Sequence, residues 1–230
     1  MIQKTFFLTK LLIYLIVKSP KDIPYYFQWV HSLNKKLSIK EYDKPWFTFK
    51  AIKWLNNYLK PDMIVFEYGS GASTLYLLNK VKKIISIEHD ANWYNTLTTI
   101  IKEMKTSNLD YILIEPEILS LNTIDVDSPD AYRSGSRGYD KLDFSKYVKL
   151  IDNYPNETFD LIIIDGRSRA SCIKHSINKI KKTGVILLDN SDRGRYQKAI
   201  SIYLNDFKSK HFYGIGPYST GRWQTSIYFK

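Results

Sequence analysis

The sequence predicts an α/β fold in which helices cover a doubly wound, mostly parallel sheet. Five short and nearly continuous apolar runs alternate with longer segments of helical character, a pattern typical of parallel strands buried on both faces. Two further apolar runs close the chain with only a turn between them, which indicates an antiparallel hairpin. The predicted sheet therefore has seven strands, and its last two strands are antiparallel.

Composition divides the chain of 230 residues into an extension and one larger domain. Residues 1–43 are basic and aromatic and are expected to form a helical extension, whereas residues 44–230 carry the α/β pattern. A hydrophobic content of 44% is enough for a domain of this size to bury a large core. The lone cysteine, Cys172, excludes an internal disulfide, and a cytoplasmic protein is the expectation.

The segment FFLTKLLIYLIV, residues 6–17, is the candidate targeting element. It is about twelve residues long and contains Lys10, so it is too short to cross a bilayer. Two interpretations remain open. Either the segment is a helix that packs on the core or on a second subunit, or residues 4–18 lie on an anionic membrane surface as an interfacial helix.

The elements of the larger domain follow in order along the chain. A helix is expected at residues 47–59, where apolar residues recur at helical spacing before Pro61. Residues 120–142 lack apolar periodicity and contain many turn formers, so they predict a long loop of the kind that is often functional. The runs expected to be strands are MIVFEYG (63–69), KIISIEH (83–89), YILIEP (111–116), FDLIIIDG (159–166), TGVILLDN (183–190), HFYGIG (211–216) and QTSIYFK (224–230).

The turn after the first predicted strand has the features of a nucleotide site. Gly69 and Gly71 permit a tight turn and a close approach of the backbone to a ligand, and Ser73 and Thr74 can cap the helix that follows. The second strand ends at Glu88, nineteen residues beyond Gly69, where a carboxylate can accept hydrogen bonds from ribose hydroxyls. Because ligands of doubly wound sheets bind outside the carboxyl ends of the strands, these residues predict a site for an adenosine-containing ligand.

Two features favour a cationic ligand over a dinucleotide at this turn. Thr74 stands where the third glycine of a dinucleotide fingerprint would be. Glu67 lies two residues before Gly69, at the mouth of the turn, where a carboxylate would repel a pyrophosphate and attract an ammonium group. The ligand is therefore expected to carry a positive charge, as S-adenosylmethionine does.

Five motifs in order give residues 62–230 a resemblance to the class I S-adenosylmethionine-dependent methyltransferases. They are FEYGSGAST, SIEHD, DLIIIDG, GVILLDN and the closing hairpin. The resemblance implies a Rossmann-like sheet and S-adenosylmethionine as the cofactor. The residues that we expect at the cofactor are Thr48, Glu67, Gly69, Ser70, Gly71, Ser73, Thr74, Glu88 and His89. For Thr48 a plain N-cap role, and for His89 a solvated position at a strand end, remain open alternatives.

The candidate catalytic residues end the fourth and fifth strands. Methyltransferases that act on exocyclic base nitrogens typically carry an Asn/Asp-Pro-Pro-aromatic tetrad after the fourth strand, whereas this chain has DGRS, which disfavours base N-methylation. Asp165, Asp189 and Asn190 are similar to the metal site of catechol-type O-methyltransferases, which implies Mg²⁺ bound to the acceptor hydroxyl. That family has a lysine where this chain has Ser168, so a metal-free alternative stays open, with Asp165 as general base and Asp189 paired to an arginine.

Arginine is confined to four segments of a chain whose cations are mostly lysine: the long loop, the ends of the fourth and fifth strands, and the final hairpin turn. In the predicted fold the first three of these segments surround the mouth of the site. The arginines are Arg133, Arg137, Arg167, Arg169, Arg193, Arg195 and Arg222. A planar guanidinium pairs with carboxylate or phosphate in a fixed geometry that lysine does not provide. The residues expected to bind an anionic acceptor are Arg133, Arg137, Arg167, Arg169 and Arg193. The alternative is that the last three neutralise Asp165, Asp189 and Asp192 in a buried network.

These observations predict an O-methyltransferase for a small anionic or saccharide acceptor, such as a uronic acid or a phosphorylated sugar. The order of the motifs resembles that of bacterial methyltransferases of polysaccharide and natural-product pathways, and this resemblance implies a pathway of that kind. Tyr132, Tyr139 and Tyr147 either line the acceptor pocket or simply pack. The net charge of +11 keeps an RNA 2′-O-methyltransferase as an alternative, although the scattered lysines argue against nucleic acid as the partner. A non-catalytic scaffold that binds the cofactor is the third interpretation. A location at the inner membrane face and an oligomeric state both remain open.

Overall fold

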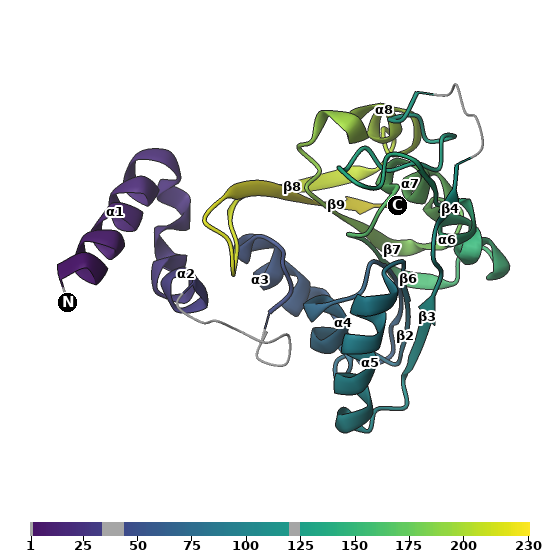
Figure 1. The fold of residues 1–230 in the computed structure, drawn as a ribbon, viewed down its shortest axis with the longest axis horizontal. Coiled ribbons are helices and arrows are strands. Elements are labelled where there is room, and N and C mark those ends of the chain that lie inside the picture. The colour runs from purple at the N-terminus through teal and green to yellow at the C-terminus, as the bar shows by residue number, and fades with distance from the viewer. Residues whose placement is uncertain (1, 34–43, 120–124) are drawn as a thin grey trace.

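The computed structural model describes residues 2–33, 44–119 and 125–230, and its main body is one seven-stranded sheet (Figure 1). The strands are β1 (Ile64–Tyr68), β2 (Lys83–Glu88), β3 (Leu109–Leu113), β6 (Phe159–Ile164), β7 (Ile180–Asp189), β8 (Lys208–Ile215) and β9 (Arg222–Phe229). Their order is β3-β2-β1-β6-β7-β9-β8. The first five strands are parallel, and β9 runs antiparallel to both β7 and β8. The predicted fold class is therefore confirmed, including the closing hairpin.

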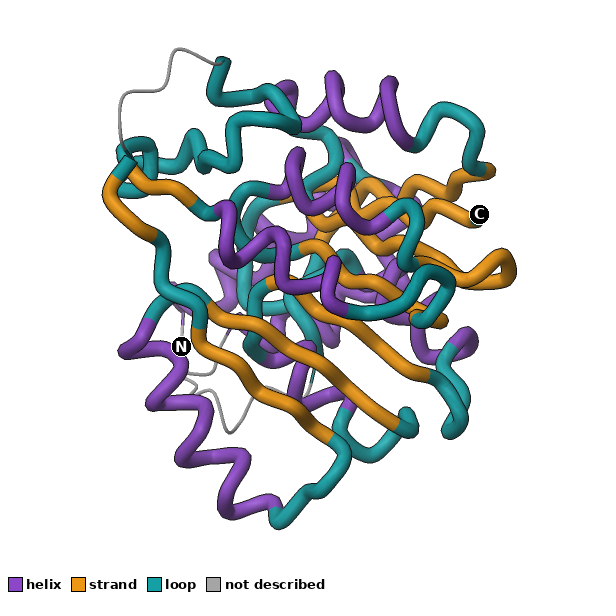
Figure 2. The backbone as a smooth tube through the Cα atoms, turned by 90° about the vertical axis from the view of Figure 1, so that its right-hand side faces the viewer, coloured by secondary structure: helices purple, strands orange, loops and turns teal. Residues whose placement is uncertain are grey.

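Helices cover both faces of the sheet, as Figure 2 shows. One face carries α3 (Phe49–Tyr58), α4 (Ala72–Leu77) and α5 (Ala91–Met104), and the other carries α6 (Ser145–Lys149), the 3-10 turn η3 (Leu150–Asn153), α7 (Arg169–Ser176) and α8 (Gly194–Tyr203). Alternate strand residues serve the two faces because side chains in a strand point to opposite sides. Val65 and Ile163 pack on the first face, while Phe66 and Ile162 pack on the second.

The predicted long loop contains a short pair of strands at its ends. β4 (Glu117–Ile118) pairs with β5 (Leu142–Asp143) in antiparallel fashion, and residues 125–141 between them form turns and bends. Two residues per strand are too few to leave a period-2 pattern, which is why the sequence did not predict this pair. Residues 120–124 of the predicted loop lie outside the described residues.

The N-terminal helices lie at the far end of the β8–β9 hairpin, apart from the layered body (Figure 1). They are α1 (Ile2–Lys18), the 3-10 turn η1 (Pro20–Tyr25) and α2 (Tyr26–Leu33). The indole of Trp29, which is fully buried, donates a hydrogen bond of 2.7 Å to the carbonyl of Ser219 in the hairpin turn. Asp22 accepts a bond of 3.1 Å from the amide of Ile215 and pairs with Lys50 at 2.7 Å. The extension is therefore held by the chain's own hairpin.

The segment predicted to be a targeting element is part of α1. Its inner face buries Leu11 and Leu15, whereas Ile13, Ile16 and Val17 are more than half exposed. No helix in the described ranges is both long and apolar enough to cross a membrane. The predicted domain boundary at residue 43 falls in the stretch 34–43, outside the residues that the structure describes.

Candidate active site

The glycine-rich turn after β1 meets the turn after β6. Gly69 has a φ of +90°, and a Cβ atom on it would lie 2.5 Å from the Cα of Gly166. A side chain therefore fits neither the conformation nor the space at Gly69. Gly71 differs, because only Trp93 comes within 4 Å of the place where its Cβ would be, at 3.9 Å. Gly69 is required by the fold, whereas Gly71 borders open space.

Beneath the turn lies a buried polar layer centred on Glu67, which is fully inaccessible to solvent. One carboxylate oxygen of Glu67 accepts hydrogen bonds from Thr74 Oγ1 at 2.5 Å and Ser86 Oγ at 2.6 Å. Thr74 Oγ1 in turn accepts a bond of 2.9 Å from the amide of Gly71, which confirms that Thr74 caps α4. Burial raises the pKa of Glu67 to about 7, although the hydroxyl hydrogen bonds lower it. Glu67 thus supports the turn from below.

Glu88 ends β2 next to the same turn. Its Oε2 accepts hydrogen bonds from the amide of Ser70 at 3.1 Å and from Ser70 Oγ at 2.8 Å. Its Oε1 accepts bonds from the amides of His89 and Asp90 at 2.8 and 2.9 Å. Burial alone would raise the pKa of Glu88, but the contacts with His89 and these amides outweigh burial and lower it. Glu88 is therefore a carboxylate held in a fixed position next to the glycine-rich turn.

Two adjoining pockets open at the carboxyl ends of the strands. The tryptophan pocket, about 300 Å³, is lined by Trp46, Ser70, Gly71, Ala72, Ser73, Trp93 and Asp165. The central pocket, about 420 Å³, is lined by Gly69, Ser70, Glu88, His89, Asp90, Trp93, Tyr139, Asp165, Gly166, Arg167, Arg169 and Arg193. Ser70, Trp93 and Asp165 border both pockets. Asp165 thus faces the glycine-rich turn on one side and the arginines on the other.

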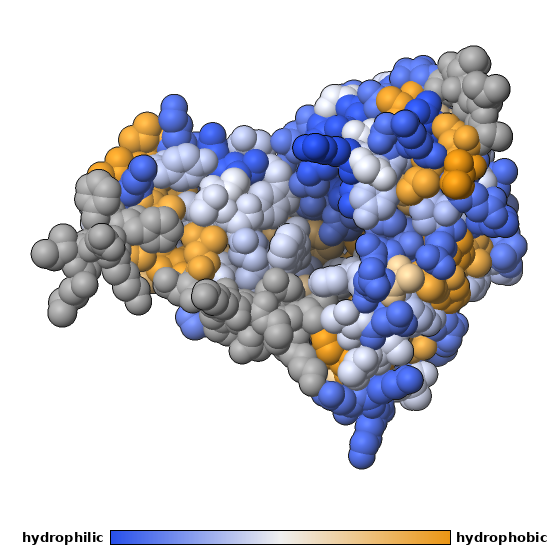
Figure 3. All heavy atoms as spheres, viewed as in Figure 1, coloured by the Kyte–Doolittle hydropathy of each residue, from blue (hydrophilic) through white to orange (hydrophobic). Residues whose placement is uncertain are grey.

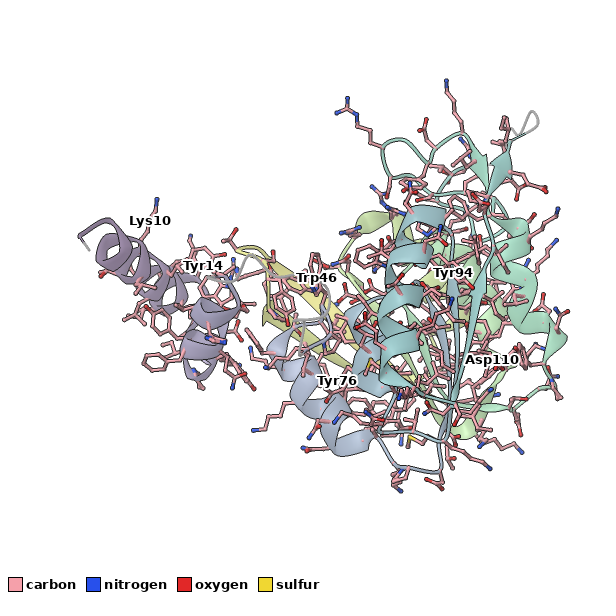
Figure 4. The ribbon with its side chains drawn as sticks, turned by 60° about the horizontal axis from the view of Figure 1, so that its bottom comes forward. Lys10, Tyr14, Trp46, Tyr76, Tyr94 and Asp110 are labelled. Atoms are coloured by element: carbon pink, nitrogen blue, oxygen red, sulfur yellow. The ribbon has the colours of Figure 1, made fainter. Side chains whose placement is uncertain are left out.

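Sequence reasoning missed the two tryptophans of this site. The Trp93 indole donates a hydrogen bond of 3.0 Å to the carbonyl of Ser70 and so fixes the turn. Its place in the first turn of the helix after Glu88 was a signal that could have been used. Trp46 precedes α3 and lies beside the hairpin, 6.0 Å from the ring of Tyr218 (Figure 4). No local sequence pattern predicts that Trp46 lines a pocket, because its position depends on packing against residues far along the chain.

Arg169 lies between the two candidate catalytic aspartates. Its Nη2 donates to Asp165 Oδ1 at 2.8 Å, and its Nη1 lies 3.9 Å from Asp189 Oδ2 and donates to the Asp189 carbonyl. The side chain of Asp165 remains 24% exposed, whereas that of Asp189 is 5% exposed. Burial raises the pKa of Asp189, and the nearby Asp165 carboxylate raises it further. Burial also raises the pKa of Asp165, although Arg169 opposes that shift.

These contacts do not fit the predicted magnesium site. The Arg169 guanidinium stands between Asp165 and Asp189 and also lies 3.4 Å from Asn190 Oδ1. Asp189 Oδ1 already accepts hydrogen bonds from Trp223 at 2.9 Å and Thr225 at 2.7 Å. Across the part of the chain that the structure describes, no cluster of three or more His, Cys, Asp or Glu residues is arranged to hold a metal. These contacts therefore give no support to the interpretation of Asp165, Asp189 and Asn190 as metal ligands.

The arginines predicted to bind an acceptor separate into different roles. Arg169 belongs to the buried network, the alternative considered from the sequence, since it also donates to the Gly166 carbonyl at 3.0 Å. Arg167 is half-buried at the central pocket, where its guanidinium stacks 4.1 Å above the ring of Tyr139. Arg193 is exposed and lines the same pocket. Arg137 is exposed and lines neither that pocket nor its neighbours.

A third, smaller hollow adjoins the central pocket, and we call it the arginine pocket. It is lined by Val126, Asp127, Arg133, Ser134, Gly135, Ser136, Gly166, Arg167, Ser168, Arg169, Ala170, Arg193, Arg195 and Tyr196. Three of the four arginine-bearing segments thus meet at one place, as the sequence predicts. Arg222, in the fourth segment, instead lies over the rings of Tyr14 and Tyr213 near the N-terminal helices.

The remaining predicted residues divide between the pockets and the core. His89 lines the central pocket, with its Nδ1 2.7 Å from Glu88 Oε1 and its Nε2 3.4 Å from Arg167 Nε. Thr48 is fully buried, its hydroxyl donates to the Phe212 carbonyl at 3.1 Å, and it lines neither the tryptophan pocket nor the central pocket. Its side chain makes no capping hydrogen bond either, although Thr48 occupies the N-cap position of α3. The buried position of Thr48 is therefore explained by its contact with the β8–β9 hairpin.

Comparisons with solved structures bear on the fold. No family model and no curated protein matches the chain. SMU.1697c from Streptococcus mutans, a presumed methyltransferase in complex with SAH, is 12% identical, with 77% of this chain and 96% of that chain covered and a TM-score of 0.50. An rRNA methylase from Streptococcus thermophilus is 13% identical, with 77% and 92% covered and a TM-score of 0.51. Precorrin-6y C5,15-methyltransferase from Geobacter metallireducens GS-15 is 16% identical, with 81% and 91% covered and a TM-score of 0.53. The chain has the fold of these methyltransferases.

Proposed function

We propose that the chain is an S-adenosylmethionine-dependent O-methyltransferase that acts on a small anionic or saccharide acceptor. The observation that carries the proposal is the position of Asp165, which borders both the pocket at the glycine-rich turn and the pocket lined by arginines. A carboxylate in this position can accept the proton of an acceptor hydroxyl while the cofactor lies at the glycine-rich turn. The shared fold, and the SAH held by the Streptococcus mutans neighbour, support the same cofactor here.

The residues at the turn fit S-adenosylmethionine, which when bound supplies a methyl group on a positively charged sulfur. Gly71 leaves space at the tryptophan pocket, and Glu88 offers a carboxylate to ribose hydroxyls. Glu67 is fully buried and lines neither pocket, so we assign it to supporting the turn rather than to direct contact with the cofactor.

The chemistry left to the chain is to position the acceptor and to remove its proton. Asp165 would accept the hydroxyl proton of the acceptor, and S-adenosylmethionine, when bound, would supply the methyl group to the acceptor oxygen and leave as the neutral thioether. A pKa raised by burial makes Asp165 a better base than an ordinary aspartate. Arg169 holds Asp165 in place through the 2.8 Å contact. Arg167 and Arg193 supply positive charge for an anionic acceptor.

Transfer of a tritium-labelled methyl group tests this function. The full chain is incubated with labelled S-adenosylmethionine and, separately, with glucose 1-phosphate, glucuronic acid or a short single-stranded RNA. We expect label in a sugar, and a roughly 100-fold or greater loss of rate in Asp165→Asn but not in the matched control Asp192→Asn, whose side chain is exposed. Label in RNA alone would support the RNA 2′-O-methyltransferase that the +11 charge suggests. Cofactor binding without transfer to any acceptor class would favour the scaffold.

We also propose that the N-terminal helices contact an anionic membrane surface. Figure 3 shows hydrophobic residues gathered over α1 and α2. Ile16 and Phe27 are 54% and 82% exposed there, and Lys10 on the same helix as Ile16 points into solvent (Figure 4). Exposed apolar side chains among lysines suit the headgroup region of anionic lipids. Such a contact would keep the enzyme near membrane-linked acceptors.

A further inference from the structure

The arginine pocket is a compact hollow that continues into the central pocket. Its volume is about 30 Å³, against about 420 Å³ for the central pocket. Gly166, Arg167, Arg169 and Arg193 line both. One ligand can therefore extend from the larger pocket into the smaller, with a compact group rather than a sugar ring at the arginine end.

Positive charge is concentrated around this hollow and only partly compensated. The cationic side chains that line it are those of Arg133, Arg167, Arg169, Arg193 and Arg195, and the acidic one is that of Asp127. Arg169 is neutralised by Asp165 at 2.8 Å. Within residues 2–33, 44–119 and 125–230, neither Arg193 nor Arg195 forms an ion pair. Guanidinium groups gathered in one hollow repel one another, so an anion bound among them is stabilised.

Two helices begin at the same hollow. Ser168 and Ala170 at the start of α7, and Arg193 and Tyr196 at the start of α8, line it. The two helices pack side by side under the loop 125–141 (Figure 1). Helix N-termini carry partial positive charge and unpaired backbone N–H groups, which favour anions. The N-termini of α7 and α8 thus add to the positive electrostatic potential that the arginine side chains create.

We propose that the arginine pocket binds a phosphate group of the acceptor and so places the rest of the acceptor in the central pocket beside Asp165. This inference rests on the proposed function and specifies its substrate class: a phosphorylated or nucleotide-linked sugar. Arg133 is held at the rim by hydrogen bonds from its guanidinium to the Asp140 carbonyl, the shorter being 2.8 Å, so its charge is fixed in position.

The number and direction of the donors distinguish phosphate from carboxylate. A carboxylate is planar and carries one charge, and one bidentate arginine satisfies it. A phosphate group carries up to two charges on tetrahedrally arranged oxygens and accepts hydrogen bonds from several directions. In this pocket Arg133 comes from the loop, Arg167 from the turn after β6, and Arg193 and Arg195 from the start of α8. Guanidinium groups that come from three segments can donate to a tetrahedral group from several directions.

Titration of the full chain with inorganic phosphate at constant ionic strength tests the site, because added salt alone would screen surface charges. We expect saturable binding that weakens at least tenfold in the double variant Arg193→Gln, Arg195→Gln. The matched control is Lys198→Gln, which removes an exposed cation from the same helix and should leave binding unchanged. Circular dichroism verifies that each variant is folded. Loss of the same size in the control, or no phosphate binding by the wild type, would overturn the site.

Competition identifies the chemical class of the acceptor group. Glucose 1-phosphate should displace phosphate at concentrations at least tenfold lower than glucuronic acid does; equal potency would overturn the assignment to phosphate. A parallel titration of the wild type with SAH separates the two proposals. If the chain binds SAH but not phosphate, the arginine pocket is not a phosphate site and the methyltransferase proposal stands. Binding of phosphate without SAH would leave the anion site and remove the methyltransferase proposal.

Discussion

Replacing Arg169 by methionine should destabilise the fold far more than replacing Arg167, two residues earlier. The Arg169 side chain is 9% exposed, and besides Asp165 Oδ1 it bonds the carbonyls of Asp165, Gly166 and Asp189. Its loss leaves two mostly buried carboxylates facing each other. Removing one partner of a buried pair costs about 3–5 kcal/mol. Arg167→Met loses a long contact of 3.4 Å with His89 Nε2 and a stacking contact with Tyr139, the latter worth about 0.5–1 kcal/mol near the surface.

The comparison is measured by urea denaturation and by thermal unfolding followed by circular dichroism. For a chain of this size each kcal/mol lowers Tm by roughly 2–4 °C, so we expect Arg169→Met to lower Tm by roughly 6–20 °C. Arg167→Met should lower it by no more than roughly 4 °C. If the two variants lose equal stability, or if Arg169→Met loses less than about 1 kcal/mol, Arg169 is not the buried link between β6 and β7 that the contacts indicate.

Three further changes test other parts of the structure. Gly69→Ala should destabilise or prevent folding because of its +90° φ and the 2.5 Å approach of Gly166, whereas Gly71→Ala should fold normally and weaken SAH binding; the opposite order of stability would contradict the roles assigned to these glycines. For Glu67, the folded pKa of about 7 lies above the ordinary 4.5, so its contribution to stability is present below pH 4.5 and is lost as pH rises through 7. The stability of the wild type relative to Glu67→Gln should therefore fall by up to about 3 kcal/mol between pH 4.5 and 8, and a gap that does not change with pH would refute the raised pKa. Ile16→Ser should reduce sedimentation with vesicles of anionic phosphatidylserine, while Ile202→Ser, equally exposed on α8 at 56% against 54%, should not; equal effects would exclude α1 as the membrane contact.

The fold could be predicted because buried parallel strands leave a clear record in the sequence. Each central strand faces helices on both sides, so its residues are apolar almost without interruption. The glycine-rich turn was also predictable, since Gly69 occupies a conformation that other residues avoid. The same logic failed for β4 and β5, which are too short to carry a period.

The arginines show where sequence reasoning ends. Arg167 and Arg169 are the same residue type two positions apart, yet one faces the pocket and the other is buried between aspartates. Between them Ser168 adopts a left-handed conformation with a φ of +50°, which turns the chain sharply. Serine gives no sequence signal for that turn. The pattern of Asp165, Asp189 and Asn190 has the same limit, because it does not show that the Arg169 guanidinium lies between the two aspartates.

Calorimetric titration of the full chain with SAH tests the central claim most directly, that the turn at Gly69 and the carboxylate of Glu88 form a site for S-adenosylmethionine. We predict saturable binding of one SAH per chain, weakened by Gly71→Ala and not displaced by NAD. An absence of binding, or displacement of SAH by NAD at similar concentrations, would contradict the proposed cofactor and leave only the fold.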